Sequence, residues 1–227
     1  MRELLLSICS SAIWCIVVCE TITGSLLFAL WKREKTLIAL LSFFVTLGLI
    51  MDAAVIGLGA LLPAGILETV SPLRFIAHGI LIPLLFPICG CALDFRRSVM
   101  RVLWIFTVIL MTAGAAEGIC TVLEPREIAG VIRFAAGEAT PAWAGTISMI
   151  LSFGTVIPMI IAGVIVWIRQ KTPFFFLSGF LMFAFSALGP ASGNADLNFF
   201  ISMFGELFMV LFLYLYAKHK TLMAACV

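Results

Sequence analysis

The sequence predicts an all-α fold, a polytopic transmembrane bundle of seven helices that forms a single domain over residues 1–227. Composition is the first reason. Hydrophobic residues make up 63% of the chain and charged residues 11%, whereas soluble domains have about 45–50% and about 25%. Because this number of charged residues is too small to cover a core of this size, the apolar excess must face lipid. The second reason is that the apolar residues form runs of about the 20 residues that a membrane span needs.

Seven apolar runs separated by charged residues are the predicted spans. Each must be a helix, because a segment in hydrocarbon has to satisfy its own backbone hydrogen bonds. The first run is too long for the apolar region of a signal peptide, which has about 7–15 residues. The sixth run is the shortest. The spans are predicted near residues 5–31, 36–62, 75–93, 102–123, 143–168, 173–190 and 197–217.

Basic residues gather in alternate connections, which predicts the orientation of the chain. The positive-inside rule places the N-terminus outside and the C-terminus in the cytoplasm, in a plasma membrane or another membrane of cytoplasmic type. Ten basic residues fall on the predicted cytoplasmic side, and four on the other. The ten are Lys32, Arg33, Lys35, Arg96, Arg97, Arg101, Arg169, Lys171, Lys218 and Lys220, and the four are Arg2, Arg74, Arg126 and Arg133.

The longest connection, residues 124–142, is expected to lie on the outer surface. It begins with Glu-Pro, which suits the start of a helix. Ile128, Val131 and Ile132 then alternate with Arg126 and Arg133 at a spacing that gives a helix one apolar side. We therefore expect a short interfacial amphipathic segment over residues 125–139.

Four ionisable residues inside the spans are the candidate catalytic residues: Asp52, His78, Glu117 and Glu206. Ionisable groups are costly in a membrane and therefore mark functional sites by default. Counting about 1.5 Å per residue from the outer span ends places all four in the outer half of the bilayer. The same count places Glu20 about 22 Å from the outer end, apart from the other acids.

Polar residues at helical spacing supply the candidate substrate-binding side chains. Arg74 lies four residues before His78 at the outer boundary of the third span, so both share one side of that helix. Asn198, Ser202 and Glu206 repeat this spacing in the seventh span, and Ser152 belongs to a similar stripe in the fifth. The alternative is structural, since buried polar residues also hold membrane helices together.

The charges of this predicted cluster do not balance. Asp52, Glu117 and Glu206 face only Arg74, which gives a formal charge of minus two with His78 neutral. A site of low dielectric does not tolerate this excess. At least one of the deep acids, Asp52 or Glu206, is therefore expected to be protonated at neutral pH, unless a cation or a charged His78 compensates.

These observations predict a membrane-embedded enzyme that acts on a lipid or an isoprenoid-like substrate. In that role His78 is the general acid or base, Asp52 and Glu206 are protonated acids, and Arg74 anchors an anionic headgroup. Two alternatives stay open. The carboxylate excess also suits a proton-coupled or cation-binding transporter of small solutes, and the cavity alone would serve a ligand-binding sensor.

Several classes of protein are disfavoured by what the sequence lacks. With only two histidines the chain cannot form the multi-histidine site of a membrane zinc hydrolase, and we predict no metal and no cofactor. The chain has no CxxC, HExxH or GxSxG motif. The expected partners are membrane lipid and a small apolar or amphipathic ligand. No nucleic acid is expected, and a homo-oligomer is compatible with the sequence.

Overall fold

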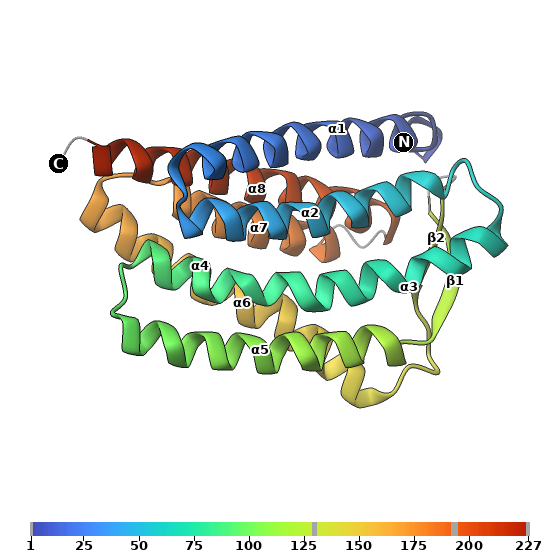
Figure 1. Cartoon of the computed structure of the whole chain (residues 1–227). Coiled ribbons are helices and arrows are strands. Elements are labelled where there is room, and N and C mark those ends of the chain that lie inside the picture. Colours follow the sequence, from blue (N-terminus) through green and yellow to red (C-terminus); the bar gives the residue numbers. More distant parts are fainter. Residues whose placement is uncertain (1, 129–130, 192–194, 226–227) are drawn as a thin grey trace.

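The structure is a computed structural model that describes residues 2–128, 131–191 and 195–225, with side chains at 9–127, 131–188 and 200–223. It shows a bundle of long helices with a β-hairpin across one end (Figure 1). The helices are α1 (Arg2–Glu34), α2 (Leu37–Leu58), α3 (Ala64–Leu81), α4 (Leu85–Ala92), α5 (Arg97–Cys120), α6 (Ala142–Gln170), α7 (Phe174–Ala191) and α8 (Ala195–Ala225). A 3₁₀ turn, η1 (Ile82–Leu84), joins α3 to α4, and the strands are β1 (Leu123–Ile128) and β2 (Val131–Ala136).

The helices have the length and composition of membrane spans. Within the described residues, six helical segments are long and apolar enough to cross a bilayer, counting α3, η1 and α4 as one rod over Ala64–Ala92. A seventh apolar segment, Phe174–Leu188 in α7, is shorter. Large apolar side chains also point outward, such as Val102 and Ile105 on α5, which are 68% and 63% exposed. The predicted fold class is confirmed, and the chain is an all-α, multi-pass membrane protein.

The two ends of the bundle differ, and we name them the hairpin end and the loop end. The hairpin end carries β1 and β2 and the start of α1, and the loop end carries the last turns of α8 (Figure 1). Short turns at Lys35, Asp94 and Lys171 reverse the chain at the loop end, each with a positive φ near 55°. The ten basic residues predicted to be cytoplasmic flank these turns or lie near the end of α8. The side of the membrane that each end faces stays a prediction.

The third span begins earlier than the sequence indicated. We placed its start at residue 75, after the charges of Glu68 and Arg74, but α3 begins at Ala64. Glu68 is exposed on the first turns of the helix, so these turns do not have to lie in the apolar part of a membrane. Arg74 consequently lies about 15 Å along α3 rather than at the membrane boundary.

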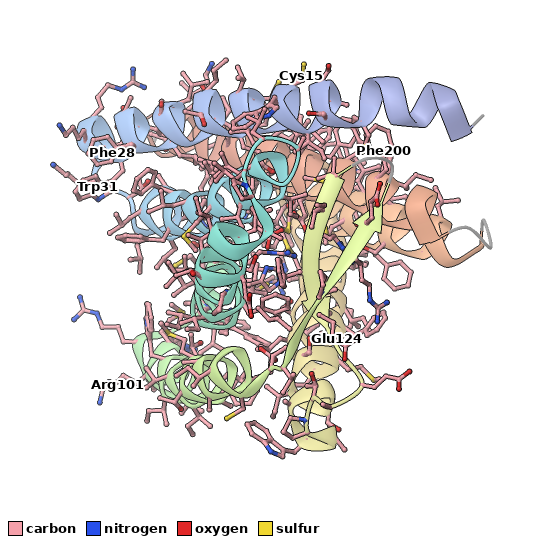
Figure 2. All side chains as sticks on the ribbon, turned by 90° about the vertical axis from the view of Figure 1, so that its right-hand side faces the viewer. Cys15, Phe28, Trp31, Arg101, Glu124 and Phe200 are labelled. Carbon is pink, nitrogen blue, oxygen red and sulfur yellow. The ribbon has the colours of Figure 1, made fainter. Side chains whose placement is uncertain are left out.

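The interfacial segment is a hairpin, so the predicted amphipathic helix over 125–139 is wrong. Arg126 pairs with Arg133 and Ile128 with Val131 in the antiparallel register. Ile132 donates its N–H to the carbonyl oxygen of Gly59 at 3.3 Å, which fixes β2 to the end of α2. A Cβ at Gly59 would collide with the carbonyl oxygen of Ile132, so this approach requires glycine. Figure 2 shows the hairpin lying across the end of the bundle, from α5 near Glu124 toward α8 near Phe200.

Glycines bring α3 and α5 into backbone contact. Gly79 on α3 and Gly114 on α5 face each other, and a Cβ on either would meet the backbone of the other. One turn further along α5, a Cβ at Gly118 would likewise meet the backbone of Ile76. Small residues four apart are a common way for membrane helices to pack closely. This contact fixes the rotation of α5 and thereby the direction of Glu117, which lies between the two glycines.

Helices α6 and α7 pack tightly near the loop end and separate toward the hairpin end. Gly163 on α6 lies so close to Phe176 that a Cβ there would meet the backbone of α7. Figure 1 shows α6 crossing the bundle obliquely, from beside the end of α5 at the hairpin end to α7 at the loop end. Pro158 lies inside α6. The divergence leaves room between α6 and α7 in the hairpin half of the bundle.

Candidate functional site

A polar cavity of about 190 Å³ lies inside the hairpin end. Side chains from α2, α3, α5, α6, α8 and β2 line it. Its ionisable and hydroxyl lining consists of Asp52, Arg74, His78, Glu117, Arg133, Ser148, Ser202 and Glu206. Residues from six elements thus surround one space.

Arg74 and Asp52 form an ion pair at the wall of this cavity. Arg74 Nε donates to Asp52 Oδ1 at 2.7 Å, and the two side chains are only 11% and 14% exposed. The sequence analysis placed Arg74 at the outer boundary of its span and Asp52 among the deep acids; this separation is wrong, because α3 begins eleven residues earlier than predicted. Arg74 Nη1 also donates to the carbonyl oxygen of Phe134 at 3.1 Å. Asp52 thus holds Arg74 in place, and Arg74 ties the hairpin to α2 and α3.

Arg133 is the site residue that the sequence analysis missed. We assigned it to the outer surface, but β2 carries it into the cavity lining. Burial, together with the nearby charge of Arg74, lowers the pKa of Arg133 to about 10, and Asp52 offsets this only in part. The alternation of Val131, Arg133 and Ala135 with Ile132 and Phe134 was the available signal, since strands place every second residue on one side. With Arg133 included, the formal charge of the cavity lining is minus one rather than minus two.

Glu117 enters the cavity from α5 beside the glycine contact with α3. Its residue surface is only 6% exposed. The hydroxyl of Thr121 lies 2.8 Å from the carbonyl oxygen of Glu117 and 3.4 Å from its Oε1. The carboxyl group therefore has a local partner on its own helix while it faces the cavity.

A second cavity of about 300 Å³ adjoins the polar one and is mainly apolar. It shares His78, Ser202 and Glu206 with the polar cavity and continues toward the loop end. Its apolar lining comes from α2, η1, α4, α6, α7 and α8: Leu49, Ile82, Leu85, Phe153, Val156, Met182, Phe183 and Met209. Phe153 and Phe183 are 52% and 37% exposed. The lining of this cavity therefore reaches the surface of the bundle at one residue of α6 and one of α7.

Glu20 belongs to the same region, although the sequence count placed it apart. Its charge acts on both Asp52 and Glu206, so the three acids are electrostatic neighbours. Glu20 is 0% exposed, and neither carboxyl oxygen has a hydrogen-bond partner in the described part of the chain. The count failed because it measures position along α1 alone and ignores how α1 packs against α2 and α8.

Most predicted site residues come together, with two differences. Asp52, Arg74, His78, Glu117, Ser202 and Glu206 line the polar cavity, whereas Ser152 lines only the apolar one. Asn198 lies in α8, but its side chain is outside the described residues. Among the described side chains, no three His, Cys, Asp or Glu groups gather as a metal-binding set. The catalytic and binding roles of these residues stay predictions.

The fold defines the class of this protein as a multi-pass helical membrane protein. No protein-family model matches the chain, and no curated protein is similar to it. Its function therefore has to be argued from the two cavities.

Proposed function

We propose that the protein is a membrane-embedded enzyme that acts on an amphipathic, lipid-like or isoprenoid-like substrate. The observation that supports this most strongly is the junction of a polar and an apolar cavity at His78, Ser202 and Glu206. A ligand that fills both cavities has a polar head and an apolar tail. The opening between α6 and α7 would admit the tail sideways from the bilayer, with the hairpin end on the outer side of the plasma membrane.

The junction is where we expect the chemistry to take place. A substrate with its head in the polar cavity and its tail in the apolar one places the bond between them beside His78 and Glu206. Imidazole and carboxyl groups are the common general acids and bases of enzymes. In this proposal His78 and Glu206 exchange protons with the substrate, Ser202 binds it, Arg74 anchors the head, and Asp52 positions Arg74.

A proton-coupled transporter is the second candidate, and Glu20 is the observation that favours it. A buried carboxylate without a partner is costly, and Glu20 would extend the acids of the cavity toward α1. Proton relays in transporters use such intramembrane acids. In this role the acids of α1, α2 and α8 would carry protons while a solute occupies the polar cavity.

The two candidates separate in one experiment on purified protein in proteoliposomes made from lipids of its own membrane. An enzyme converts a lipid, which mass spectrometry detects as a new species that grows with time. The variant His78→Gln should abolish the conversion, and His219→Gln is its matched control, because His219 is the other histidine and lies at the loop end. Solute flux driven by a pH gradient, with all lipid masses unchanged, would overturn the enzyme and favour the transporter. Binding without conversion or flux would indicate a sensor.

A further inference from the structure

The polar cavity is electrically polarised along its length. Arg74 and Arg133 lie where the hairpin contacts the helices, because Arg74 donates to Phe134 on the same strand that carries Arg133. The acids that act on one another, Glu20, Asp52 and Glu206, come from α1, α2 and α8. A ligand in this cavity therefore meets two guanidinium groups near the hairpin, one of them paired with Asp52, and the carboxyl group of Glu206 next to the apolar cavity.

The charges of the two arginines act unfavourably on each other. The charge of Arg74 destabilises that of Arg133, and so does the charge of Arg126 on the neighbouring strand. Burial adds to this, and Asp52 is the group that partly offsets it. Asp52 is the 2.7 Å partner of Arg74, and its charge also acts on Arg133. An anion placed between the arginines would relieve this repulsion.

We propose that Arg74 and Arg133 bind the phosphate group of a lipid whose chain occupies the apolar cavity. This rests on the proposed function, in that it assigns the chemical class of the substrate head. Guanidinium groups bind phosphate through paired N–H···O hydrogen bonds of fixed geometry. Phosphate is favoured over a lone ammonium head because a cation at this position would meet both arginines.

The order of groups along the cavities fits such a lipid. The phosphate lies between the arginines at the hairpin, the linkage that follows it lies beside His78 and Glu206, and the chain enters the apolar cavity toward α7. The ion pair with Asp52 and the hydrogen bond to Phe134 hold Arg74 in position before a ligand binds. The site is therefore preorganised for the head, which lowers the entropy cost of binding.

The test is equilibrium binding to the full-length protein in nanodiscs, measured by the displacement of a fluorescent single-chain lipid. Four probes separate head from tail: hexadecyl phosphate, hexadecanol, hexadecyltrimethylammonium and inorganic phosphate. We expect hexadecyl phosphate to bind at least tenfold more tightly than hexadecanol or the ammonium probe. Inorganic phosphate should compete only weakly, because it lacks the chain. If inorganic phosphate bound as tightly as hexadecyl phosphate, the proposal that the phosphate belongs to a lipid would be overturned.

Variants of the hairpin provide the control for charge. Arg133→Gln should weaken the binding of hexadecyl phosphate at least tenfold. Arg133→Lys should weaken the binding less, because lysine keeps the charge but not the paired donors. Arg126→Gln is the matched control, since Arg126 lies directly opposite Arg133 in the register but is exposed outside the cavity lining. It should change binding less than twofold. If the Arg126 and Arg133 variants weakened binding equally, the probe would be attracted by the general surface charge of the hairpin, and the proposal would be overturned.

The outcome also separates this inference from the proposed function. If hexadecyl phosphate shows the expected preference but no lipid changes mass, the phosphate site stands and the enzyme is wrong. If a lipid changes mass but the probes bind without regard to phosphate, the enzyme stands and the phosphate site is wrong. Tighter binding of hexadecyltrimethylammonium than of hexadecyl phosphate would overturn the inference directly.

Discussion

The two ends of the bundle use polar residues in opposite ways. At the loop end, Tyr216 Oη lies 3.1 Å from Gln170 Oε1 and 3.3 Å from the carbonyl oxygen of Ala92, and Gln170 Nε2 donates to the same oxygen at 3.2 Å. Lys220 donates to Asp94 at 2.7 Å. At the hairpin end, polar residues from six elements instead face a shared cavity, and only some of them contact one another.

The difference lies in whether the polar residues bond to one another or line a cavity. Tyr216, Gln170 and Lys220 thus bond to one another or to backbone carbonyls and stabilise the contact of α4, α6 and α8. Within the described residues, Thr36, Thr172 and His219 near the same end each keep a buried polar atom without a partner. A groove does run along that end, but its ionisable pair, Lys220 and Asp94, is already joined. The hairpin end keeps acids, a histidine and two arginines around a space, at a cost in stability that a ligand could offset.

The largest expected effect concerns the junction of the two cavities. His78→Gln or Glu206→Gln should lower the rate of lipid conversion by about 10²–10⁴, the usual contribution of general acid–base catalysis. The amides keep the size and polarity of the originals, so the free energy of unfolding should change by less than about 1 kcal/mol. Mass spectrometry of the product and thermal unfolding in detergent provide the two readouts. If the variants lost stability and activity in equal proportion, these residues would have a structural role in helix packing and not a catalytic one.

The ion pairs of the two ends should differ in strength. Asp52→Ala leaves Arg74 without its partner in a site that is 11% exposed, which should cost about 3 kcal/mol of unfolding free energy. Asp94→Asn is the control at the loop end, where the Asp94 side chain is 70% exposed and asparagine tolerates the positive φ of the turn. It should cost less than about 1 kcal/mol. Denaturation in mixed micelles measures both, and equal losses would mean that the hairpin-end pair is as solvated as the other.

Docking of the hairpin can be tested through Gly59. Gly59→Ala places a Cβ against the carbonyl oxygen of Ile132, and such overpacking typically costs about 1–3 kcal/mol. The amide of Ile132 should lose protection from hydrogen exchange, because it donates to Gly59. Gly65→Ala serves as control, since a Cβ at Gly65 meets nothing within 4 Å. Unchanged exchange over residues 131–136 in the Gly59 variant would contradict the docked hairpin.

The smallest effect is expected at the loop end. Tyr216→Phe removes a hydroxyl group while Gln170 keeps its hydrogen bond to Ala92. The unfolding free energy should fall by about 1 kcal/mol, the usual value for one hydrogen bond. Lipid conversion should stay within twofold of the parent, because Tyr216 lies far from the cavity along α8. A large loss of activity would show that the two ends are coupled.

The sequence predicted the helices well because hydrophobic length is a property of each segment alone. It predicted that Asp52, His78, Glu117 and Glu206 share the outer half of the membrane, since helices rise by a constant amount per residue, and the four residues line one cavity. It failed where tertiary contact decides. The start of α3 at Ala64 was hidden by Glu68, which α3 carries on an exposed side.

The hairpin was the main failure, and its cause is physical. Over 125–136 the apolar residues fit a helical spacing and a strand spacing about equally, and short segments cannot be distinguished by period. The contacts of β2 with Gly59 and Arg74 bring Arg133 inward. The sequence alone could not predict that Glu20 lies near Glu206, because their proximity depends on how α1 and α8 pack.

The central claim is that one amphipathic ligand occupies both cavities, and photolabelling tests it most directly. Single-chain lipids with a diazirine near the end of the tail would be irradiated with the protein in nanodiscs, and the labelled peptides mapped by mass spectrometry. The account predicts labels at residues 152–156 of α6 and 182–186 of α7, which an excess of unlabelled lipid suppresses. Labels confined to the exposed surface of α5 at residues 102–109, without competition, would show that lipid only surrounds the bundle and would contradict the account.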